Sequence, residues 1–294
     1  MTTTGLVSVL IPVFNRRQFI EATLKSVFEQ DYPSVEIIVV DDGSTDGSYE
    51  VLESYRARGA IQLLSHPERK NRGQSASINL ALKRANGEFI AILDSDDLFE
   101  RGKLTKQVQY FKHHPECGLV YGMGKAIDAD GNPLYDILSS AHRERNQPGD
   151  LLVDCYFHLP VNSLVRRSVY DQVGDFEESF RAAQDHDMSI RMAEVTQFGF
   201  LPELMFYYRR HAESISNLGA ETRWKTGFEI LRRARQRYPY PAAVIRKRAA
   251  VLHFRLGEVR LGQRRYVAAL FNFAKAALFD PKRAFRVLLG KEKR

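Results

Sequence analysis

Three carboxylates lie within four residues, at Asp94, Asp96 and Asp97, directly after the apolar run 87–93. Carboxylates this close repel one another at neutral pH, so a cation or hydrogen-bond donors must offset them. Carboxylate oxygens are the ligands that Mg²⁺ and Mn²⁺ prefer, and such a metal commonly holds a diphosphate. The run therefore indicates a metal and phosphate site. The alternative is a helix that starts near Leu98 and is capped by Asp94 or Asp96.

A second polar loop follows another candidate strand. The β-branched, apolar run 35–40 is followed by DDGSTDGS at residues 41–48. In α/β folds, ligands bind at the carboxyl ends of parallel strands, where loops of this composition lie. The alternative is ordinary turn chemistry with a cap for a helix that begins near Tyr49.

The elements that must position these loops alternate along the chain. The pattern predicts a first strand over 7–12, a helix through Glu29, the strand 35–40, a helix from about Tyr49, a strand over 61–64, a helix over 75–85 and the acidic strand. This alternation predicts an α/β fold, doubly wound, in which a mostly parallel sheet carries helices on both faces.

Four segments in this order resemble the motifs of the family 2 glycosyltransferases. They are VLIPVFNR (9–16), DDGSTDGS (41–48), NRGQSA (71–76) with Asn79, and LDSDD (93–97). The resemblance continues to about residue 215. It implies the GT-A fold and an inverting transfer from a nucleotide-diphosphate sugar, with a UDP-sugar favoured.

The resemblance also implies roles for single residues. Asp42 would recognise the nucleotide base, Asp94 would lie near the ribose and sugar, and Asp96 would bind Mn²⁺ or Mg²⁺. The other donor-binding residues that it implies are Pro12, Phe14, Asn15, Arg72, Asn79 and Ser95. Many relatives carry Arg before the Asn of the third motif, where this chain has Ile78, so we expect Arg72 or Lys70 to substitute.

The second half is expected to supply the acceptor side and the base. Residues 159–170 predict a strand followed by a helix start, and Gln184-Asp185 matches the family motif that carries the catalytic base before a helix. One carboxylate suffices to take the proton of the attacking acceptor hydroxyl in a single displacement. The alternative for Asp185 is a helix N-cap, and His186 is expected to pack or hydrogen-bond locally.

A histidine ends the resemblance. Residues 207–216 resemble the family segment Tyr-Arg-x-His-x-x-Ser-x-Ser, and imidazole binds Mn²⁺ readily. His211 is therefore expected to complete the metal shell or to contact the diphosphate. A structural or exposed histidine is the alternative.

Composition indicates a cytoplasmic enzyme. Cys117 and Cys155 lie far apart, the N-terminus lacks a basic region before an apolar one, and no apolar run reaches about 18 residues. The processive membrane synthases of the superfamily usually carry Gln-x-x-Arg-Trp, and the nearest match, at 220–224, lacks the Gln. A non-processive transferase is therefore expected.

Charge is unevenly distributed. Residues 218–294 hold 20 Lys and Arg against 5 Asp and Glu, which is a net charge of +15, whereas the first 217 residues carry −8. Such asymmetry indicates an acidic partner, either an anionic membrane surface that would place the protein peripherally on the inner membrane face, or an acidic glycan. A solvated helical face is the alternative. No nucleic-acid partner is expected, because no recognition motif accompanies the charge.

The basic tail also has a helical pattern. Small and apolar residues at 256, 257, 269, 273, 276 and 281 have the spacing of one tetratricopeptide-like helix pair. One such pair cannot form a solenoid, so we expect it to pack on the catalytic domain or to form a homodimer. The apolar, Lys- and Arg-containing segment 271–289 suits an interfacial helix interrupted at Pro281.

The predicted organisation is a GT-A catalytic domain over 1–217, with a nucleotide-sugar half at about 1–100 and an acceptor half at 101–217, followed by a basic helical extension over 218–294. The predicted function is transfer of a hexose or N-acetylhexosamine to a hydroxyl of a glycan or lipid-linked precursor in surface polysaccharide biosynthesis. The alternatives are an inactive nucleotide-sugar binding module and a nucleotidyltransferase, although the latter normally needs a Gly-rich basic loop after the first strand.

Overall fold

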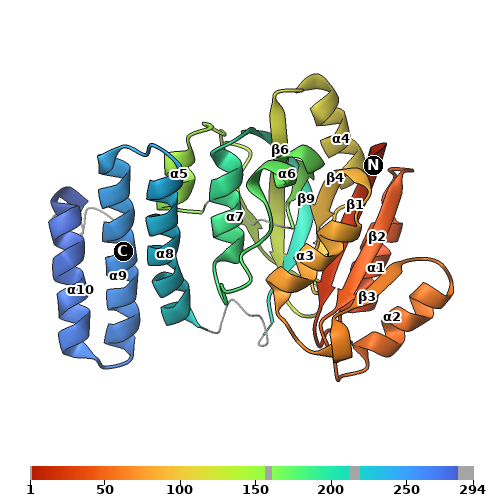
Figure 1. Ribbon diagram of the computed structural model, residues 1–294, viewed down its shortest axis with the longest axis horizontal. Coiled ribbons are helices and arrows are strands. Elements are labelled where there is room, and N and C mark those ends of the chain that lie inside the picture. The colour runs from red at the N-terminus through yellow and green to blue at the C-terminus, as the bar shows by residue number, and fades with distance from the viewer. Residues whose placement is uncertain (1, 156–160, 212–218, 284–294) are drawn as a thin grey trace. The chain divides into compact units, whose positions relative to one another are not determined.

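The structure is a computed structural model that describes residues 2–155, 161–211 and 219–283 (Figure 1). The described residues form two compact units that interleave along the chain. The first contains residues 2–146, 161–179 and 195–211, and the second contains 147–155, 180–194 and 219–283. These units do not correspond to a single cut after residue 217. The predicted boundary there stays a prediction.

The first unit is built on one mixed sheet. Its described strands are β1 (Thr3–Val13), β2 (Val35–Asp41), β3 (Gln62–Ser65), β4 (Gly87–Ile92), β5 (Leu98–Phe99), β6 (Cys117–Ile127), β7 (Pro133–Ile137), β8 (Ser163–Arg166) and β9 (Gln197–Arg209). They lie in the order β3-β2-β1-β4-β8-β6-β9-β5, and β7 pairs with β6.

Parallel pairing dominates only one half of this sheet. Strand β1 lies parallel to β2 and β4, and β2 lies parallel to β3. Beyond β4 the sheet is mixed, because β8 is antiparallel to both β4 and β6 while β9 is parallel to β6. The parallel half brings the carboxyl ends of β1, β2 and β4 to one edge, where the predicted loops begin.

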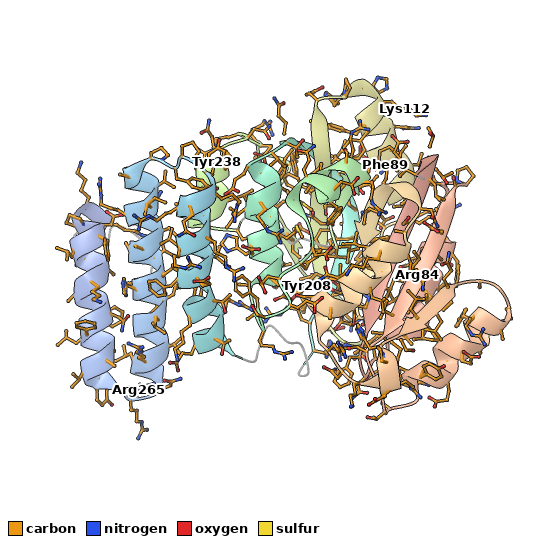
Figure 2. The ribbon with its side chains drawn as sticks, viewed as in Figure 1. Arg84, Phe89, Lys112, Tyr208, Tyr238 and Arg265 are labelled. Carbon is orange, nitrogen blue, oxygen red and sulfur yellow. The ribbon has the colours of Figure 1, made fainter. Side chains whose placement is uncertain are left out.

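Helices cover both faces of the sheet, which confirms the predicted doubly wound α/β fold. The helices of the first unit are α1 (Ile20–Phe28), α2 (Ser48–Ala57), α3 (Gln74–Arg84), α4 (Lys103–His113) and α6 (Arg167–Val173), with the short 3-10 helix η1 (Pro67–Arg69). Alternate β1 residues such as Val9 and Ile11 pack with α1, α2 and α4 in one core cluster. Helix α3 contacts β1 and β2, and α6 contacts β4 and β8, yet neither contributes to that cluster, so they cover the opposite face. Side chains such as Phe89, which stacks on Phe111, fill the core (Figure 2).

The expectation of a helix starting near Leu98 is wrong. Leu98 and Phe99 form β5, which pairs antiparallel with Tyr207 and Phe206 of β9. Helix α4 begins at Lys103, after Gly102 in the left-handed conformation, and no side chain caps it. Helix capping therefore does not account for Asp94 or Asp96.

The second unit is helical. Its helices are α5 (Pro148–Val153), α7 (Gln184–Ala193), α8 (Ala220–Arg237), α9 (Ala242–Gly262) and α10 (Tyr266–Phe279). Helices α9 and α10 form the predicted pair, and a Cβ on Gly257 would lie only 2.7 Å from the Phe273 ring. The part of the predicted interfacial helix from residue 284 onward lies outside the described residues. Among the described helices, none is long and apolar enough to cross a bilayer.

Candidate active site

The loop after β2 is tied to the loop before α3 by Asp42. Both carboxylate oxygens of Asp42 accept backbone N–H groups, from Arg72 at 2.7 Å and from Gly73 at 2.8 Å. The two loops approach so closely that a Cβ on Gly43, whose φ is +81°, would lie 2.3 Å from the carbonyl oxygen of Arg69. Asp42 is only 3% exposed. Its two hydrogen bonds therefore hold the loops in place, in addition to any contact that it makes with a ligand.

The loop after β1 is locked to the same β2 loop. Asn15 has φ 52° and donates its backbone N–H to Ser44 Oγ at 3.0 Å, while its side-chain oxygen accepts the N–H of Thr45 at 2.8 Å. The backbone N–H of Arg16 binds Ser48 Oγ at 2.8 Å. Phe14 is exposed beside these locked residues, so its ring is available to a planar ligand such as a nucleotide base.

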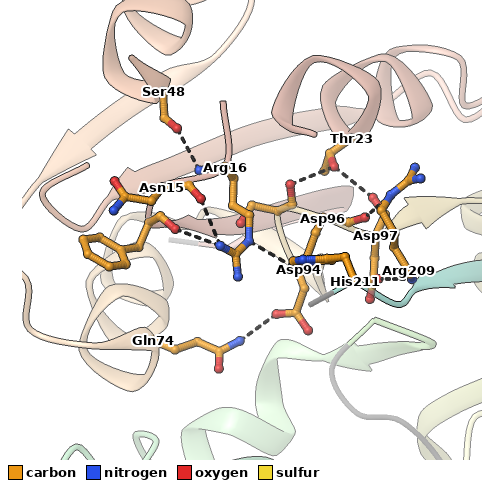
Figure 3. Close-up of polar contacts among 12 residues, drawn as sticks. Asn15, Arg16, Thr23, Ser48, Gln74, Asp94, Asp96, Asp97, Arg209 and His211 are labelled. Atoms are coloured by element: carbon orange, nitrogen blue, oxygen red, sulfur yellow. Dashed lines mark hydrogen bonds and ion pairs between the residues drawn. The ribbon is translucent and has the colours of Figure 1, made fainter. Parts of the chain in front are cut away.

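Each carboxylate of the acidic loop, residues 94–97, has a different hydrogen-bond partner (Figure 3). Asp94 accepts a hydrogen bond from Gln74 Nε2 at 2.6 Å. Asp96 Oδ2 lies 3.0 Å from both Arg16 Nε and His211 Nε2. Residues from three distant parts of the chain thus meet at the Asp96 carboxylate, and the Arg16 guanidinium offsets its charge.

The third carboxylate, Asp97, is structural. Its side chain is 1% exposed and accepts the backbone N–H of Arg209 at 2.7 Å. Burial, followed by the charges of Asp96 and Asp94, raises the pKa of Asp97 well above its usual range. A second anchor is Thr23, whose single hydroxyl hydrogen is shared between the backbone carbonyls of Ser95 at 3.1 Å and Asp97 at 3.0 Å. These contacts fix the loop backbone that presents Asp94 and Asp96.

Arg209 braces the acidic loop from β9. Its Nε donates to the Asp96 carbonyl at 2.9 Å, and its Nη1 donates to the carbonyls of Asp128 at 3.1 Å and Ala129 at 2.8 Å. The next residue but one, His211, is held by ring contact with Phe19, with centroids 4.7 Å apart. The segment resembling Tyr-Arg-x-His therefore brings a brace and a ligand candidate to the acidic loop.

The Asp96 and His211 pair fits a divalent cation. Asp96 Oδ2 and His211 Nε2 are hydrogen-bonded at 3.0 Å, and two cis ligands at about 2.1 Å from an octahedral metal lie about the same distance apart. No cluster of three or more His, Cys, Asp or Glu side chains able to hold a metal occurs among the described residues. A Mg²⁺ or Mn²⁺ ion bound by few protein ligands takes its remaining ligands from substrate phosphates and water, so this pair suits a metal that arrives with a diphosphate.

The other predicted donor residues have more varied positions. Pro12 is buried in β1, and Ser95 is 6% exposed with its carbonyl bound by Thr23. Asn79 is 1% exposed and uses its whole amide on the 176–178 segment, since it accepts the N–H of Phe176 and donates to Phe176 O and Glu178 Oε1. Direct donor contact by Asn79 stays a prediction, but these bonds give it a positioning role. Ile78 is buried in α3, and the Arg72 side chain is exposed.

Asp185 lies in the second unit, in the first turn of α7. The N-cap of α7 is Ala183 and no side chain caps it, so the N-cap alternative for Asp185 is not supported. The neighbouring His186 is buried and binds Leu151 O through Nε2 at 2.6 Å, which confirms its expected local role. Burial lowers the pKa of His186 to about 3, with a further contribution from Arg248, whose Nη2 lies 3.4 Å from His186 Nδ1. The neutral His186 thus fixes the backbone next to Asp185.

The roles of Arg16, Gln74 and Arg209 were not predicted from the sequence. All three lie within or directly beside the quoted motifs, and that position was the only signal. Their partners are 80, 20 and 113 residues away respectively, so spacing alone gave no indication of these pairs.

Comparison with known proteins identifies the family of this fold and site. The family model described as Glycosyl transferase family 2 matches residues 8–174, so the chain belongs to that family. The putative teichuronic acid biosynthesis glycosyltransferase TuaG of Bacillus subtilis is 38% identical over 129 residues, which are 44% of this chain and 50% of TuaG. The matched region thus spans half the length of that relative.

Two solved structures share the fold. Staphylococcus aureus TarS 1–349 in complex with UDP-GlcNAc has a TM-score of 0.64 at 20% identity, over 92% of this chain and 81% of TarS 1–349. The mannosyltransferase PcManGT from Pyrobaculum calidifontis in complex with GDP-Man and Mn²⁺ also has a TM-score of 0.64 at 20% identity, over 98% of this chain and 80% of that one. The similarity in fold to these two structures confirms the GT-A fold class predicted from the sequence.

Proposed function

We propose that this protein is a metal-dependent inverting glycosyltransferase that transfers a hexose or N-acetylhexosamine from a UDP-sugar to a hydroxyl of a glycan or lipid-linked precursor. The observation that carries the proposal is the convergence of Arg16 and His211 on Asp96, at the carboxyl edge of a parallel sheet. The name of TuaG supports polysaccharide biosynthesis as the setting, and the complexes of TarS with UDP-GlcNAc and of PcManGT with GDP-Man support a nucleotide sugar as the donor.

The donor would be held by the loops that Asp42 and Asn15 tie together. Phe14 would contact the base beside Asp42, and Asp94, oriented by Gln74, would face the ribose and sugar. Asp96 and His211 would hold Mn²⁺ or Mg²⁺, whose positive charge offsets the diphosphate. Residues outside this group, including Asn79 and Arg209, position the loops.

The transfer is a single displacement. The acceptor oxygen attacks C1 of the sugar opposite the diphosphate, the bond from C1 to the diphosphate oxygen breaks, and its electron pair leaves on the nucleoside diphosphate. Asp185 is the proposed base that takes the hydroxyl proton, and the motif Gln184-Asp185 supports this role. His186, anchored to Leu151 and Arg248 within the second unit, would keep the Asp185 backbone in place.

The test is a panel of nucleotide sugars incubated with the purified chain and Mn²⁺, with release of nucleoside diphosphate as the readout. We expect one UDP-sugar to be turned over, faster when acceptor is added, and the rate to collapse in Asp96→Asn but not in Asp171→Asn, an exposed surface acid. Slow hydrolysis without acceptor still counts as turnover. Failure of every nucleotide sugar to bind or react would refute the proposal.

A further inference from the structure

Helix α10 has an apolar face that no described residue covers. Tyr266, Val267, Leu270, Phe271 and Leu278 are 63%, 86%, 70%, 58% and 78% exposed. At helical spacing these positions, with the exposed Ala274 among them, share one side of the helix. We call this set the outer face of α10. Contiguous exposed apolar surfaces of this kind mark sites of interaction with proteins, ligands or membranes.

The opposite side of α10 already has its partner. Ala269, Asn272 and Ala276 are buried, and Asn272 Oδ1 lies 3.1 Å from His253 Nδ1 of α9. The Phe273 ring packs against Gly257 and lies 5.6 Å from Phe254, centroid to centroid. Helix α10 is therefore fixed on α9 by one side, and its outer face is presented without contributing to the packing of the second unit.

Basic residues lie near both ends of α10. Arg264 and Arg265 are exposed just before its N-terminal end, where Arg265 pairs with Glu221 (Figure 2 labels Arg265). The exposed Lys282 follows its C-terminal end, after the C-cap residue Asp280. Along the helix, Lys275 is the single charged residue, and its Nζ lies 4.4 Å from the Phe271 ring centroid. A long basic side chain lying along an apolar one can place its alkyl stem in an apolar layer and its ammonium group at the polar boundary.

We propose that the outer face of α10 docks on an anionic lipid surface, with the helix lying in the plane of the interface. An exposed apolar side suits a helix that lies at the boundary between lipid chains and headgroups. The basic residues near both ends, which outnumber Asp280, would meet anionic headgroups, and no described helix can span the bilayer. A second copy of the chain fits less well. In an antiparallel pair of α10 helices, Arg264 and Arg265 of one copy would approach Lys282 of the other, and a parallel pair would also bring like charges together.

The test is flotation of the full chain with phosphatidylglycerol-rich vesicles and with pure phosphatidylcholine vesicles, at low and high salt. Neither donor nor metal is needed, so failure here is distinct from failure of the transferase proposal. The variant Leu270→Ser/Leu278→Ser removes two exposed side chains from the outer face, and Leu134→Ser, which changes an exposed leucine of β7, is the matched control. Val267→Ser, at the most exposed position, is a second probe that disturbs no packing.

We expect binding to phosphatidylglycerol-rich vesicles that weakens as salt rises, because the cations are screened. The double serine variant should bind at least about tenfold more weakly, since two side chains no longer leave water, and Leu134→Ser should bind like the unaltered chain. Absence of vesicle binding at low salt, or binding unchanged in both outer-face variants, overturns the proposal. A concentration-dependent dimer that is lost in the double variant would assign the face to a second copy and would also overturn it.

Discussion

Replacement of Asp42 should destabilise the fold as well as remove a ligand contact. Its side chain is 3% exposed and accepts two backbone N–H groups, from Arg72 at 2.7 Å and Gly73 at 2.8 Å. Hydrogen bonds to a charged group contribute about 1.5–3 kcal/mol each. Both bonds are only partly buried, so the two N–H groups can partly rehydrate when the carboxylate is removed. We therefore expect Asp42→Ala to lower the free energy of unfolding by about 2–4 kcal/mol. A loss of that size would be a substantial part of a typical stability of about 5–15 kcal/mol.

Asp42→Asn separates the anchoring role from base recognition. The amide would set an NH₂ group against one of the two backbone N–H groups, so Asn should restore little of the lost stability. If Asp42 served only to accept a hydrogen bond from the base, the Asn oxygen could still do so and stability would not change. Urea unfolding and UDP binding should be measured for both variants, with Asp171→Ala as an exposed control. Unfolding free energies of Asp42→Ala and the unaltered chain within about 0.5 kcal/mol would refute the reasoning.

Three other substitutions test separate parts of the structure. Asp185→Asn should retain donor binding and lose about 10²–10⁴-fold in transfer rate, and a variant with normal transfer would exclude Asp185 as the base. Arg16→Met should tighten Mn²⁺ binding without donor about three- to tenfold, measured by electron paramagnetic resonance, because Asp96 loses a competing cation; weaker binding would contradict this. Burial lowers the pKa of Lys103 to about 7. Above that pH the unfolded chain therefore binds more protons than the folded chain. The free energy of unfolding of the unaltered chain should rise relative to that of Lys103→Met between pH 7 and pH 10. The rise should approach about 1.4 kcal/mol per pH unit in urea titrations, and parallel pH profiles would show that Lys103 is not buried as a neutral amine.

The parallel half of the fold was predictable because its signals are local. Strands β1, β2 and β4 are apolar runs followed directly by polar loops, and right-handed crossover rules leave few ways to arrange them. The same logic placed Asp42, Asp94 and Asp96 at one edge of the sheet. The later strands were harder, since β8 pairs antiparallel with both β4 and β6, and nothing in its four residues specifies direction.

The acidic residues of the site could be predicted from the sequence, but their hydrogen-bond and ion-pair partners could not. The helix expected near Leu98 fails because two residues pair with β9, more than 100 positions later, and that pairing is set by tertiary packing. Long-range partners also decide which acid does what. Asp97 is buried and accepts a hydrogen bond from the Arg209 backbone, whereas Asp96 contacts the side chains of Arg16 and His211. Residue type alone does not distinguish these two carboxylates.

The metal site on Asp96 is tested most directly by calorimetric titration of UDP into the purified chain, with Mn²⁺ and again with excess chelator. We expect UDP to bind with Mn²⁺, binding to be greatly weakened by chelator, and a similar loss in Asp96→Asn despite an intact fold. His211→Ala should weaken the Mn²⁺-dependent part of binding in the same direction. UDP binding of equal affinity with chelator and in Asp96→Asn would show that donor binding does not depend on a metal held by this carboxylate.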